Sequence, residues 1–294
     1  MSIEIKGIIP AMVTPLDEDE DLDEAALRRF VNFLIDAGVH GLFPVGSQGE
    51  FYAFSPDEKR RVWEIVVDEA AGRVPVYAGT GAITTRQVKE LNQIAEDVGM
   101  DAVSVISPFF ISPTDEELYE HYMDIADATS LPVLPYNNPG RTGVRLSPIL
   151  ISRLAEHPNI VGVKDSGGDL TVTIEMIRRT DDTFAVLMGR DSLIYAGLHH
   201  GIKGAIAASG SVVPALVVEI YEAFQAGDME LALAAQERLL PLRLAFGLGT
   251  FPVVVRDAVN MIGIPVGPAR KPVTSLTGDA REKLRRTLIQ MGVL

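Results

Sequence analysis

Residues 160–169 read IVGVKDSGGD, an apolar run that leads into a lysine and then a Ser-Gly-Gly turn. A β-branched run that ends at such a turn predicts a buried strand whose last residues reach a loop. Lys164 stands at the end of this strand, and lysine is seldom buried without a partner. This stretch alone leaves two interpretations open. Either desolvation lowers the pKa of the Lys164 amine and frees it to form a Schiff base, or the side chain snorkels to the strand end and pairs with Asp165.

Apolar strand patterns and helix patterns alternate on both sides of this stretch. The strand candidates are 5–13, 41–45, 74–79, 102–107, 133–136, 160–164, 185–188 and 204–208. Strands that alternate with helices at intervals of roughly 20 to 35 residues predict an α/β fold, the (β/α)8 TIM barrel. A doubly wound sheet is the alternative fold, but no GxGxxG opens a helix after a strand.

The chain continues beyond the eighth predicted strand. Helical patterns lie at 213–226, 229–246, 252–262 and 277–291, and no Gly/Ser linker separates them from the rest. We therefore expect a barrel over residues 1–225 and a C-terminal helical extension over residues 226–294. This appendage is expected to belong to the same unit as the barrel.

The composition excludes several classes of function. The net charge of −14 disfavours nucleic acid and anionic membranes as partners, although a small anionic substrate can still meet a locally positive site. The absence of cysteine excludes disulfides, thiolate metal sites and cysteine nucleophiles. No export signal opens the sequence, and the longest uncharged run, 204–218, is too short to cross a bilayer. We expect a cytoplasmic protein.

Reactive side chains follow several of the predicted strands, and the active site of a parallel barrel lies at these strand ends. The second strand is followed by GSQGE, whose glycines let backbone N–H groups converge on an anion beside Ser47 and Gln48. The fifth is followed by YNNPGRTG, which offers the phenol of Tyr136 for proton transfer and the guanidinium of Arg141 for a carboxylate. Each motif alone also fits a plain turn.

The ordered motifs GSQGE, YNNPGRTG and GVKDSGGD, with a glycine after the seventh strand, resemble those of the dihydrodipicolinate synthase/N-acetylneuraminate lyase family. The resemblance covers nearly the whole chain. It implies a class I aldolase that handles pyruvate through a Schiff base on a (β/α)8 barrel. It also implies a homotetramer, built as a dimer of dimers, that needs no cofactor beyond the covalent lysine imine.

The resemblance also implies a role for each site residue. Lys164 would form the imine with the ketone of pyruvate or another 2-oxo acid, and Tyr136 would shuttle protons beside it. Ser47 would hold the pyruvate carboxylate and orient Tyr136. The implied substrate-binding residues are Gln48 at the carboxylate, Arg141 at the far end of the second substrate, and Gly189 and Ile206 along the pocket wall.

Three positions depart from the family pattern. Gln48 replaces the second hydroxyl of the GTTGE-type loop, and Ser211 replaces an asparagine past the eighth strand. Phe110 stands where many members carry a tyrosine that enters a neighbouring subunit, and loss of a general acid or base costs about 10²–10⁴-fold in rate. These departures favour a lyase for a 2-keto-3-deoxy sugar acid or 4-hydroxy-2-oxoglutarate, with Gln48 bonded to a substrate hydroxyl. Dihydrodipicolinate synthase of lysine biosynthesis and a sugar-acid dehydratase are the alternatives.

Two other classes of protein are alternatives to an aldolase of this family. A metal-dependent aldolase needs histidine and carboxylate ligands at strand ends, whereas the five histidines are scattered, so no metal site is expected. A non-catalytic barrel that senses a 2-oxo acid would bind pyruvate without turning over any sugar acid. Turnover separates this last class from the enzymes.

Overall fold

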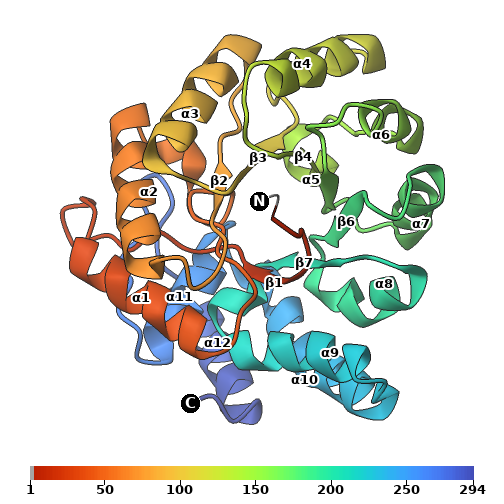
Figure 1. Ribbon diagram of the computed structural model, residues 1–294. Helices are drawn as coiled ribbons and strands as arrows, with labels where there is room; N and C mark the ends of the chain where they lie inside the picture. Colours follow the sequence, from red (N-terminus) through yellow and green to blue (C-terminus); the bar gives the residue numbers. More distant parts are fainter. Residues whose placement is uncertain (1–2) are drawn as a thin grey trace.

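The computed structural model describes residues 3–294. Seven parallel strands form one sheet in the order β1-β7-β6-β5-β4-β3-β2, and the sheet curls so that helices cover its outer side (Figure 1). The strands are β1 (Gly7–Pro10), β2 (Tyr77–Gly79), β3 (Ala102–Ile106), β4 (Val133–Asn137), β5 (Gly162–Asp165), β6 (Ala185–Met188) and β7 (Gly204–Ala207). The α/β class predicted from the sequence is therefore confirmed.

Helices follow most of the strands, and several more close the chain. They are α1 (Glu24–Asp36), α2 (Pro56–Ala70), α3 (Thr85–Val98), α4 (Asp115–Asp127), α5 (Pro139–Thr142), α6 (Pro148–Leu154), α7 (Leu170–Arg179), α8 (Ile194–His200), α9 (Pro214–Gln225), α10 (Met229–Ala245), α11 (Val253–Met261) and α12 (Gly278–Gln290). The helical patterns predicted at 213–226, 229–246, 252–262 and 277–291 correspond to α9, α10, α11 and α12.

The second of the eight predicted strands, residues 41–45, is not formed as a strand. Residues 41–45 make only isolated bridges, through Leu42 on one side and Phe43 on the other. Pro44 has no N–H to donate to a ladder, and the positive φ of Val45, 53°, ends the extended conformation. The prediction of eight strands is thus wrong at this segment, which links the two edges of the seven-stranded sheet by single bridges.

Local signals fix where the helices begin. At α2, the Ser55 side chain accepts the N–H of Glu58 while the Glu58 carboxylate accepts the N–H of Ser55. This reciprocal capping box stands directly before Pro56, whose fixed φ suits the first helical position. Thr114 and Glu117 repeat the arrangement at α4. Both helix starts are therefore encoded in adjacent residues of the sequence.

Strand alternation divides the core into two layers. In β1, Ile8 packs toward the helices, whereas Ile9 joins a smaller apolar cluster formed with inward residues of the other strands. In β5, Val163 belongs to the outer layer. The next residue, Lys164, pairs in register with Tyr136 of β4 and Leu187 of β6 and so lies on the inner side of the sheet.

A buried ion pair joins the C-terminal helices to the loop after residues 41–45. Arg256 of α11 and Glu50 are both 0% exposed, and the Arg256 Nε lies 3.0 Å from Glu50 Oε1. The remaining guanidinium nitrogens donate to the carbonyl groups of Val266 and Thr14, each at 2.8 Å. The backbone N–H of Arg270 donates to the other Glu50 oxygen at 3.1 Å. Each charged group of this pair is therefore hydrogen-bonded inside the fold.

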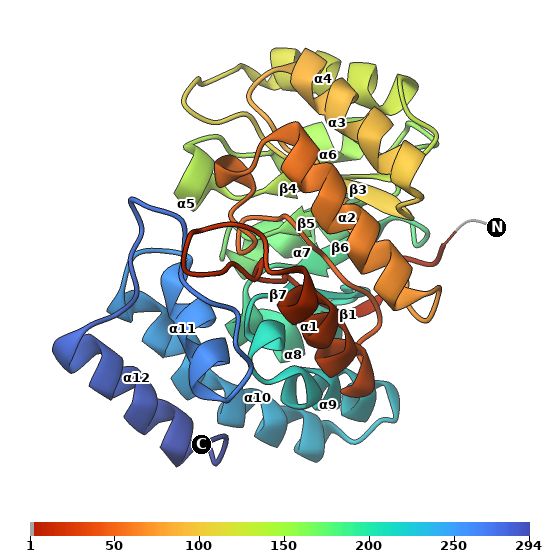
Figure 2. The same cartoon turned by 90° about the vertical axis from the view of Figure 1, so that its left-hand side faces the viewer.

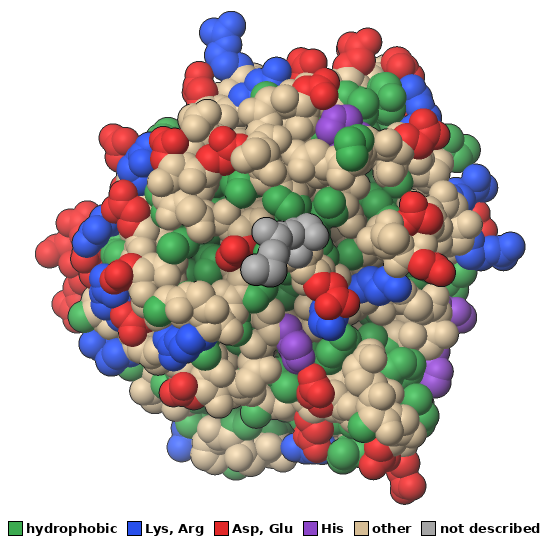
Figure 3. All heavy atoms as spheres, viewed as in Figure 1, with side chains coloured by type: hydrophobic (Ala, Val, Ile, Leu, Met, Phe, Trp, Pro, Cys, Tyr) green, Lys and Arg blue, Asp and Glu red, His purple; other side chains and the backbone are tan. Residues whose placement is uncertain are grey.

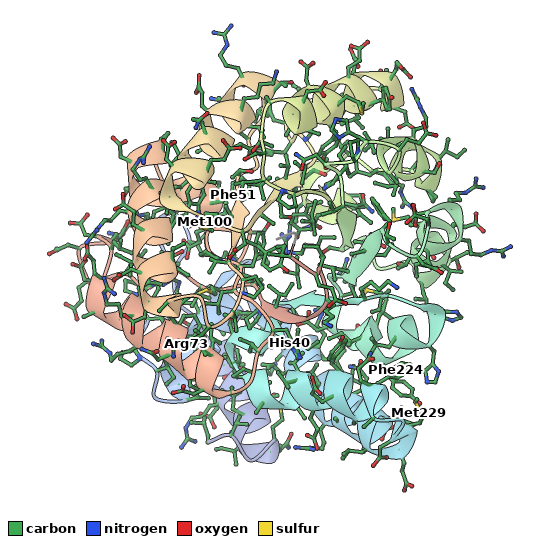
Figure 4. The ribbon with its side chains drawn as sticks, in the orientation of Figure 1. His40, Phe51, Arg73, Met100, Phe224 and Met229 are labelled. Atoms are coloured by element: carbon green, nitrogen blue, oxygen red, sulfur yellow. The ribbon has the colours of Figure 1, made fainter. Side chains whose placement is uncertain are left out.

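The face that carries the start of the chain shows no concentration of one charge, since acidic and basic side chains are interspersed around it (Figure 3). His40, labelled in Figure 4, accepts the N–H of Ile8 at 3.1 Å and contacts Glu222 at 2.7 Å. It is a packing residue of this end of the sheet. Within residues 3–294, no helix combines the length and the apolar character that a bilayer crossing requires.

Candidate active site

A cavity of about 330 Å³ opens at the carboxyl ends of the strands. Figure 2 shows α5 and α11 on this side of the molecule, away from the N-terminus. The cavity brings together every site residue named from the sequence: Ser47, Gln48, Tyr136, Arg141, Lys164, Gly189 and Ile206. Segments far apart in the chain thus converge on one pocket.

Lys164 lies at the closed end of the cavity and is 3% exposed. Its Nζ is 4.0 Å from the centre of the Tyr136 ring and 4.8 Å from that of Phe43. Burial lowers the pKa of the Lys164 amine, while interactions with Tyr136 and Asp191 oppose the shift. A lowered pKa makes more of the neutral, nucleophilic amine available at neutral pH.

The alternative pairing of Lys164 with Asp165 is wrong. Asp165 points to the other side of β5, as strand alternation requires. Its Oδ1 accepts hydrogen bonds from Asn137 Nδ2 at 2.8 Å and from the N–H of Gly167 at 2.9 Å, and its Oδ2 accepts one from Thr173 Oγ1 at 2.6 Å. Within the part of the chain that the structure describes, no carboxylate forms an ion pair with Lys164.

Tyr136 occupies the position on β4 that faces Lys164 across the sheet. Burial alone would raise the pKa of its phenol, but the Lys164 charge and hydrogen bonds from Ser166, Ser47 and Asn138 lower it below the ordinary value. The Asn138 Nδ2 donates to the phenol oxygen at 2.8 Å. A phenol and an amine that lie together, each with a lowered pKa, are suited to pass protons between them and to a bound substrate.

The GSQGE loop presents unpaired polar groups to the cavity. Ser47 is 8% and Gln48 is 5% exposed. Among residues 3–294, the backbone N–H groups of these two residues have no acceptor, and the buried Gln48 Oε1 has no donor. Buried polar groups are normally paired, so this loop is suited to a ligand that supplies a carboxylate and a donor. A plain turn does not account for it.

The wall of the cavity also carries the two residues named for the later strands. The Gly189 carbonyl accepts a hydrogen bond from Ser166 Oγ at 3.3 Å, and a Cβ on Gly189 would lie 1.9 Å from that Oγ. Any larger residue at Gly189, which directly follows β6, would displace the Ser166 side chain. Ile206 of β7 is 1% exposed and gives this wall an apolar portion.

The outer part of the cavity contains Arg141, which was named from the sequence, and three residues that were missed: Arg243, Phe246 and Phe251. Arg141 is exposed, and its Cζ stacks 4.2 Å from the ring centre of Phe251. Arg243 and Phe246 join Phe251 in lining the cavity from the C-terminal helices. No local signal could have identified Arg243, because it reads as one more charged residue of a helix that carries several. The tertiary placement of α10 against the strand ends gives it this position.

Phe110, which departs from the family pattern, lies outside the cavity of its own chain. Its side chain is 94% exposed and its φ is positive, 71°. The preceding Phe109 packs edge-on against Phe51, with ring centres 5.8 Å apart. Residues 3–294 contain no cluster of three or more histidine or acidic side chains that could hold a metal ion.

Comparison with known proteins gives one consistent result. Residues 4–291 match the model of the dihydrodipicolinate synthetase family. The 4-hydroxy-tetrahydrodipicolinate synthase of Methanopyrus kandleri is 43% identical over 100% of this chain and 99% of its own. Two solved structures superpose on this chain with a TM-score of 0.96, over 99% of this chain and 100% of theirs. One is the dihydrodipicolinate synthase of Acinetobacter baumannii complexed with pyruvate, which is 35% identical. The other is a prophage protein of Escherichia coli K12 from the same family in complex with pyruvate, which is 32% identical.

The family resemblance seen in the sequence motifs is therefore confirmed over almost the whole chain. Members of this family are lyases that act through a lysine Schiff base, and the relative from Methanopyrus kandleri is named a synthase. The protein is an enzyme of that kind, and its chain belongs to the dihydrodipicolinate synthetase family.

Proposed function

We propose that this enzyme is a 4-hydroxy-tetrahydrodipicolinate synthase, which joins pyruvate to aspartate 4-semialdehyde. The sequence analysis ranked this activity behind a sugar-acid lyase. The names of relatives that are 36–43% identical over nearly the whole chain favour the synthase. The observation that carries the mechanism is Lys164, a buried amine with a lowered pKa beside Tyr136.

The proposed first half of the reaction forms the imine. The neutral Lys164 amine attacks the ketone carbon of pyruvate, and the resulting carbinolamine loses water once its hydroxyl has received a proton from Tyr136. Within residues 3–294 the N–H groups of Ser47 and Gln48 have no acceptor, so they can donate to the pyruvate carboxylate. The product is a protonated imine, which withdraws electrons from the neighbouring carbon.

The proposed second half forms the carbon–carbon bond. Loss of a proton from the pyruvate methyl carbon gives an enamine, which attacks the aldehyde carbon while a proton moves to the aldehyde oxygen. Tyr136 is placed to move these protons, since its pKa is lowered by its surroundings. The condensed product then leaves Lys164, in the synthase by an internal amine that displaces the lysine and in a lyase by addition of water.

Reductive trapping tests the mechanism. We expect pyruvate and cyanoborohydride to add one reduced pyruvate unit to the intact mass of the protein and to inactivate it. Lys164→Met should form no adduct and should lose at least about 10⁴-fold in turnover. The matched control is Lys89→Met, an exposed lysine beside Asp124, which should be trapped normally. Absence of an adduct on the unaltered protein would contradict the proposal.

A lyase for a 2-keto-3-deoxy sugar acid is the second candidate. The buried Gln48 Oε1 has no donor among residues 3–294, and a substrate hydroxyl would supply one. The two activities are separated by substrate. Condensation with aspartate 4-semialdehyde supports the synthase, whereas pyruvate release from a 2-keto-3-deoxy sugar acid, reduced by Gln48→Leu, supports the lyase.

We also propose that the enzyme assembles as a homotetramer. Phe110 supports this, because an apolar ring that is 94% exposed on a backbone with positive φ is costly in water unless another surface covers it. Sedimentation of the unaltered protein and of Phe110→Ser would report the assembly directly.

A further inference from the structure

Three arginines line the outer part of the cavity and come from separate segments of the chain. Arg141 lies in α5, Arg190 follows β6, and Arg243 lies in α10. Over residues 3–294, none of the three forms an ion pair with a carboxylate. With Lys164 at the closed end, the cavity of a chain with a net charge of −14 is lined by four cationic side chains and one acidic residue.

Asp191, the single acidic residue that lines the cavity, forms no ion pair with these arginines within residues 3–294. Its carboxylate accepts the backbone N–H of Ser209 at 2.7 Å and that of Ala208 at 3.3 Å, and it also accepts the Ser209 hydroxyl. Asp191 is 2% exposed, so these groups take up its hydrogen-bonding capacity within the wall. Its carbonyl accepts Gln236 Nε2 of α10 at 3.0 Å, which ties that helix to the cavity.

Arg190 is held in place by its Nε, which donates to the Ser166 carbonyl at 3.0 Å. The chain makes room for this contact at Gly168, where a Cβ would lie 2.9 Å from that Nε and where φ is +85°. In the described chain, the two terminal nitrogens of Arg190 have no hydrogen-bond partner. These nitrogens are the pair that binds carboxylate or phosphate in a bidentate manner.

Arg243 stands close enough to Arg190 for the two charges to repel each other. Burial and Arg190 lower the pKa of Arg243, and Asp191 opposes that shift. Its guanidinium Cζ lies 5.1 Å from the ring centre of Phe246. In residues 3–294 it has no hydrogen-bond acceptor. Two unpaired, like-charged guanidinium groups at one cavity create a site that an anion would stabilise.

We infer that Arg190 and Arg243 form an anion subsite for the end of the second substrate that is remote from the reacting aldehyde, where they bind a carboxylate or a phosphate group. The inference rests on the proposed function, since it assumes that pyruvate occupies the Lys164 end of the same cavity. Pyruvate is too short to reach from Lys164 to the exposed outer part, so the remaining space belongs to the aldehyde. The subsite makes an anionic aldehyde a better substrate than a neutral one.

Aldehydes of matched reactivity test the subsite. Pyruvate consumption is measured with neutral glyceraldehyde, with glyceraldehyde 3-phosphate and with aspartate 4-semialdehyde, whose remote groups are a hydroxyl, a phosphate and a carboxylate. We expect Arg190→Gln and Arg243→Gln each to raise KM for the preferred anionic aldehyde about 10- to 100-fold. The KM for pyruvate and for glyceraldehyde should change less than about twofold. The aldehyde whose KM rises more in these variants shows whether the subsite binds a phosphate or a carboxylate.

The control for α10 is Arg238→Gln, because Arg238 lies on the same helix but pairs at the surface with Glu219. It should leave each KM unchanged. A second readout does not require turnover: the protein with reduced pyruvate on Lys164 is titrated calorimetrically with inorganic phosphate and with acetate. We expect saturable binding of one anion, lost in Arg190→Gln and Arg243→Gln.

The outcomes separate this inference from the proposed function. If the unaltered protein forms no pyruvate adduct, the proposed function fails. If the adduct forms while both variants retain anion binding and the preference between charged and neutral aldehydes, the anion subsite is wrong and the Schiff-base mechanism stands. An equal rise in KM for charged and neutral aldehydes would also overturn the subsite, because it would reflect a general distortion of the cavity.

Discussion

Lys164 and Arg256 are both buried cations, and their surroundings differ in one respect. Arg256 is 0% exposed and its guanidinium is paired with Glu50 and with two carbonyl groups. Lys164 is 3% exposed and faces aromatic rings, with no carboxylate paired to it among residues 3–294. One cation is satisfied by the fold, and the other is left for a ligand.

The difference follows from what each side chain can do with its proton. Arginine remains protonated in proteins, so burying it requires a full set of acceptors. Lysine can lose its proton when it is buried, and the neutral amine is a nucleophile. The fold therefore stabilises the charged form of Arg256 and destabilises the charged form of Lys164. Substitutions should affect the two sites in opposite ways.

The largest expected effect concerns proton transfer. Tyr136→Phe should lower turnover about 10²–10⁴-fold, or about 3–5.5 kcal/mol, because it removes the proposed general acid and base. Since Tyr136 raises the pKa of Lys164, its loss should also move the midpoint of pyruvate trapping to lower pH. Cyanoborohydride trapping across a pH series measures this shift. A midpoint that moved upward would contradict the coupling of the two groups, and Tyr195→Phe, on α8, is the matched control.

The next effect concerns the satisfied charge. Arg256→Met should lower the free energy of unfolding by about 3–5 kcal/mol, because Glu50 would remain buried without its counter-charge. The exposed pair of Arg238 and Glu219 provides the contrast, and Arg238→Met should cost about 0–1 kcal/mol. Denaturant titration measures both. The double variant Arg256→Met/Glu50→Gln should recover part of the loss; if it is no more stable than Arg256→Met alone, the buried carboxylate is not the source of the cost.

The smallest effect has the opposite sign. Lys164→Met keeps the approximate volume and removes a desolvated amine, so we expect unfolding to cost about 1 kcal/mol more. Burying the charged Lys164 costs stability in full at pH values below its lowered pKa in the folded protein. This cost disappears as the pH rises to the pKa of lysine in the unfolded chain. The stability gained by Lys164→Met should therefore shrink in alkaline solution. Thermal unfolding at several pH values measures it. If Lys164→Met clearly lowered the free energy of unfolding, the charge of Lys164 would stabilise the fold, as that of Arg256 does.

Much of the fold could be predicted from adjacent residues. The capping boxes at Ser55 and Thr114 each join residues three positions apart, so the starts of α2 and α4 are encoded in adjacent residues. The strand at residues 41–45 was predicted from its apolar pattern, and it failed because Pro44 and the positive φ of Val45 interrupt the ladder. A hydrophobic pattern alone does not reveal that the backbone of residues 41–45 departs from the extended conformation.

Site residues could be predicted where they belong to a short motif of reactive side chains. They could not be predicted where their role depends on contacts with residues far away in the sequence. The GSQGE motif drew attention to Ser47 and Gln48, while Glu50 in the same motif went unnoticed, because its function appears only through Arg256, 206 residues later. Arg243 was missed for a similar reason, since only tertiary placement of α10 turns it into the cavity. Roles created by long-range packing leave little trace in local sequence.

The pairing of Glu50 with Arg256 has a consequence for folding during synthesis. Glu50 emerges from the ribosome long before residue 256, and its neutralising guanidinium does not yet exist when β1 to β7 have been made. Because contacts of such large sequence separation form late, the loop that carries Ser47 and Gln48 lacks its anchor until α11 has been translated. A nascent chain of this enzyme therefore acquires its binding loop near the end of translation.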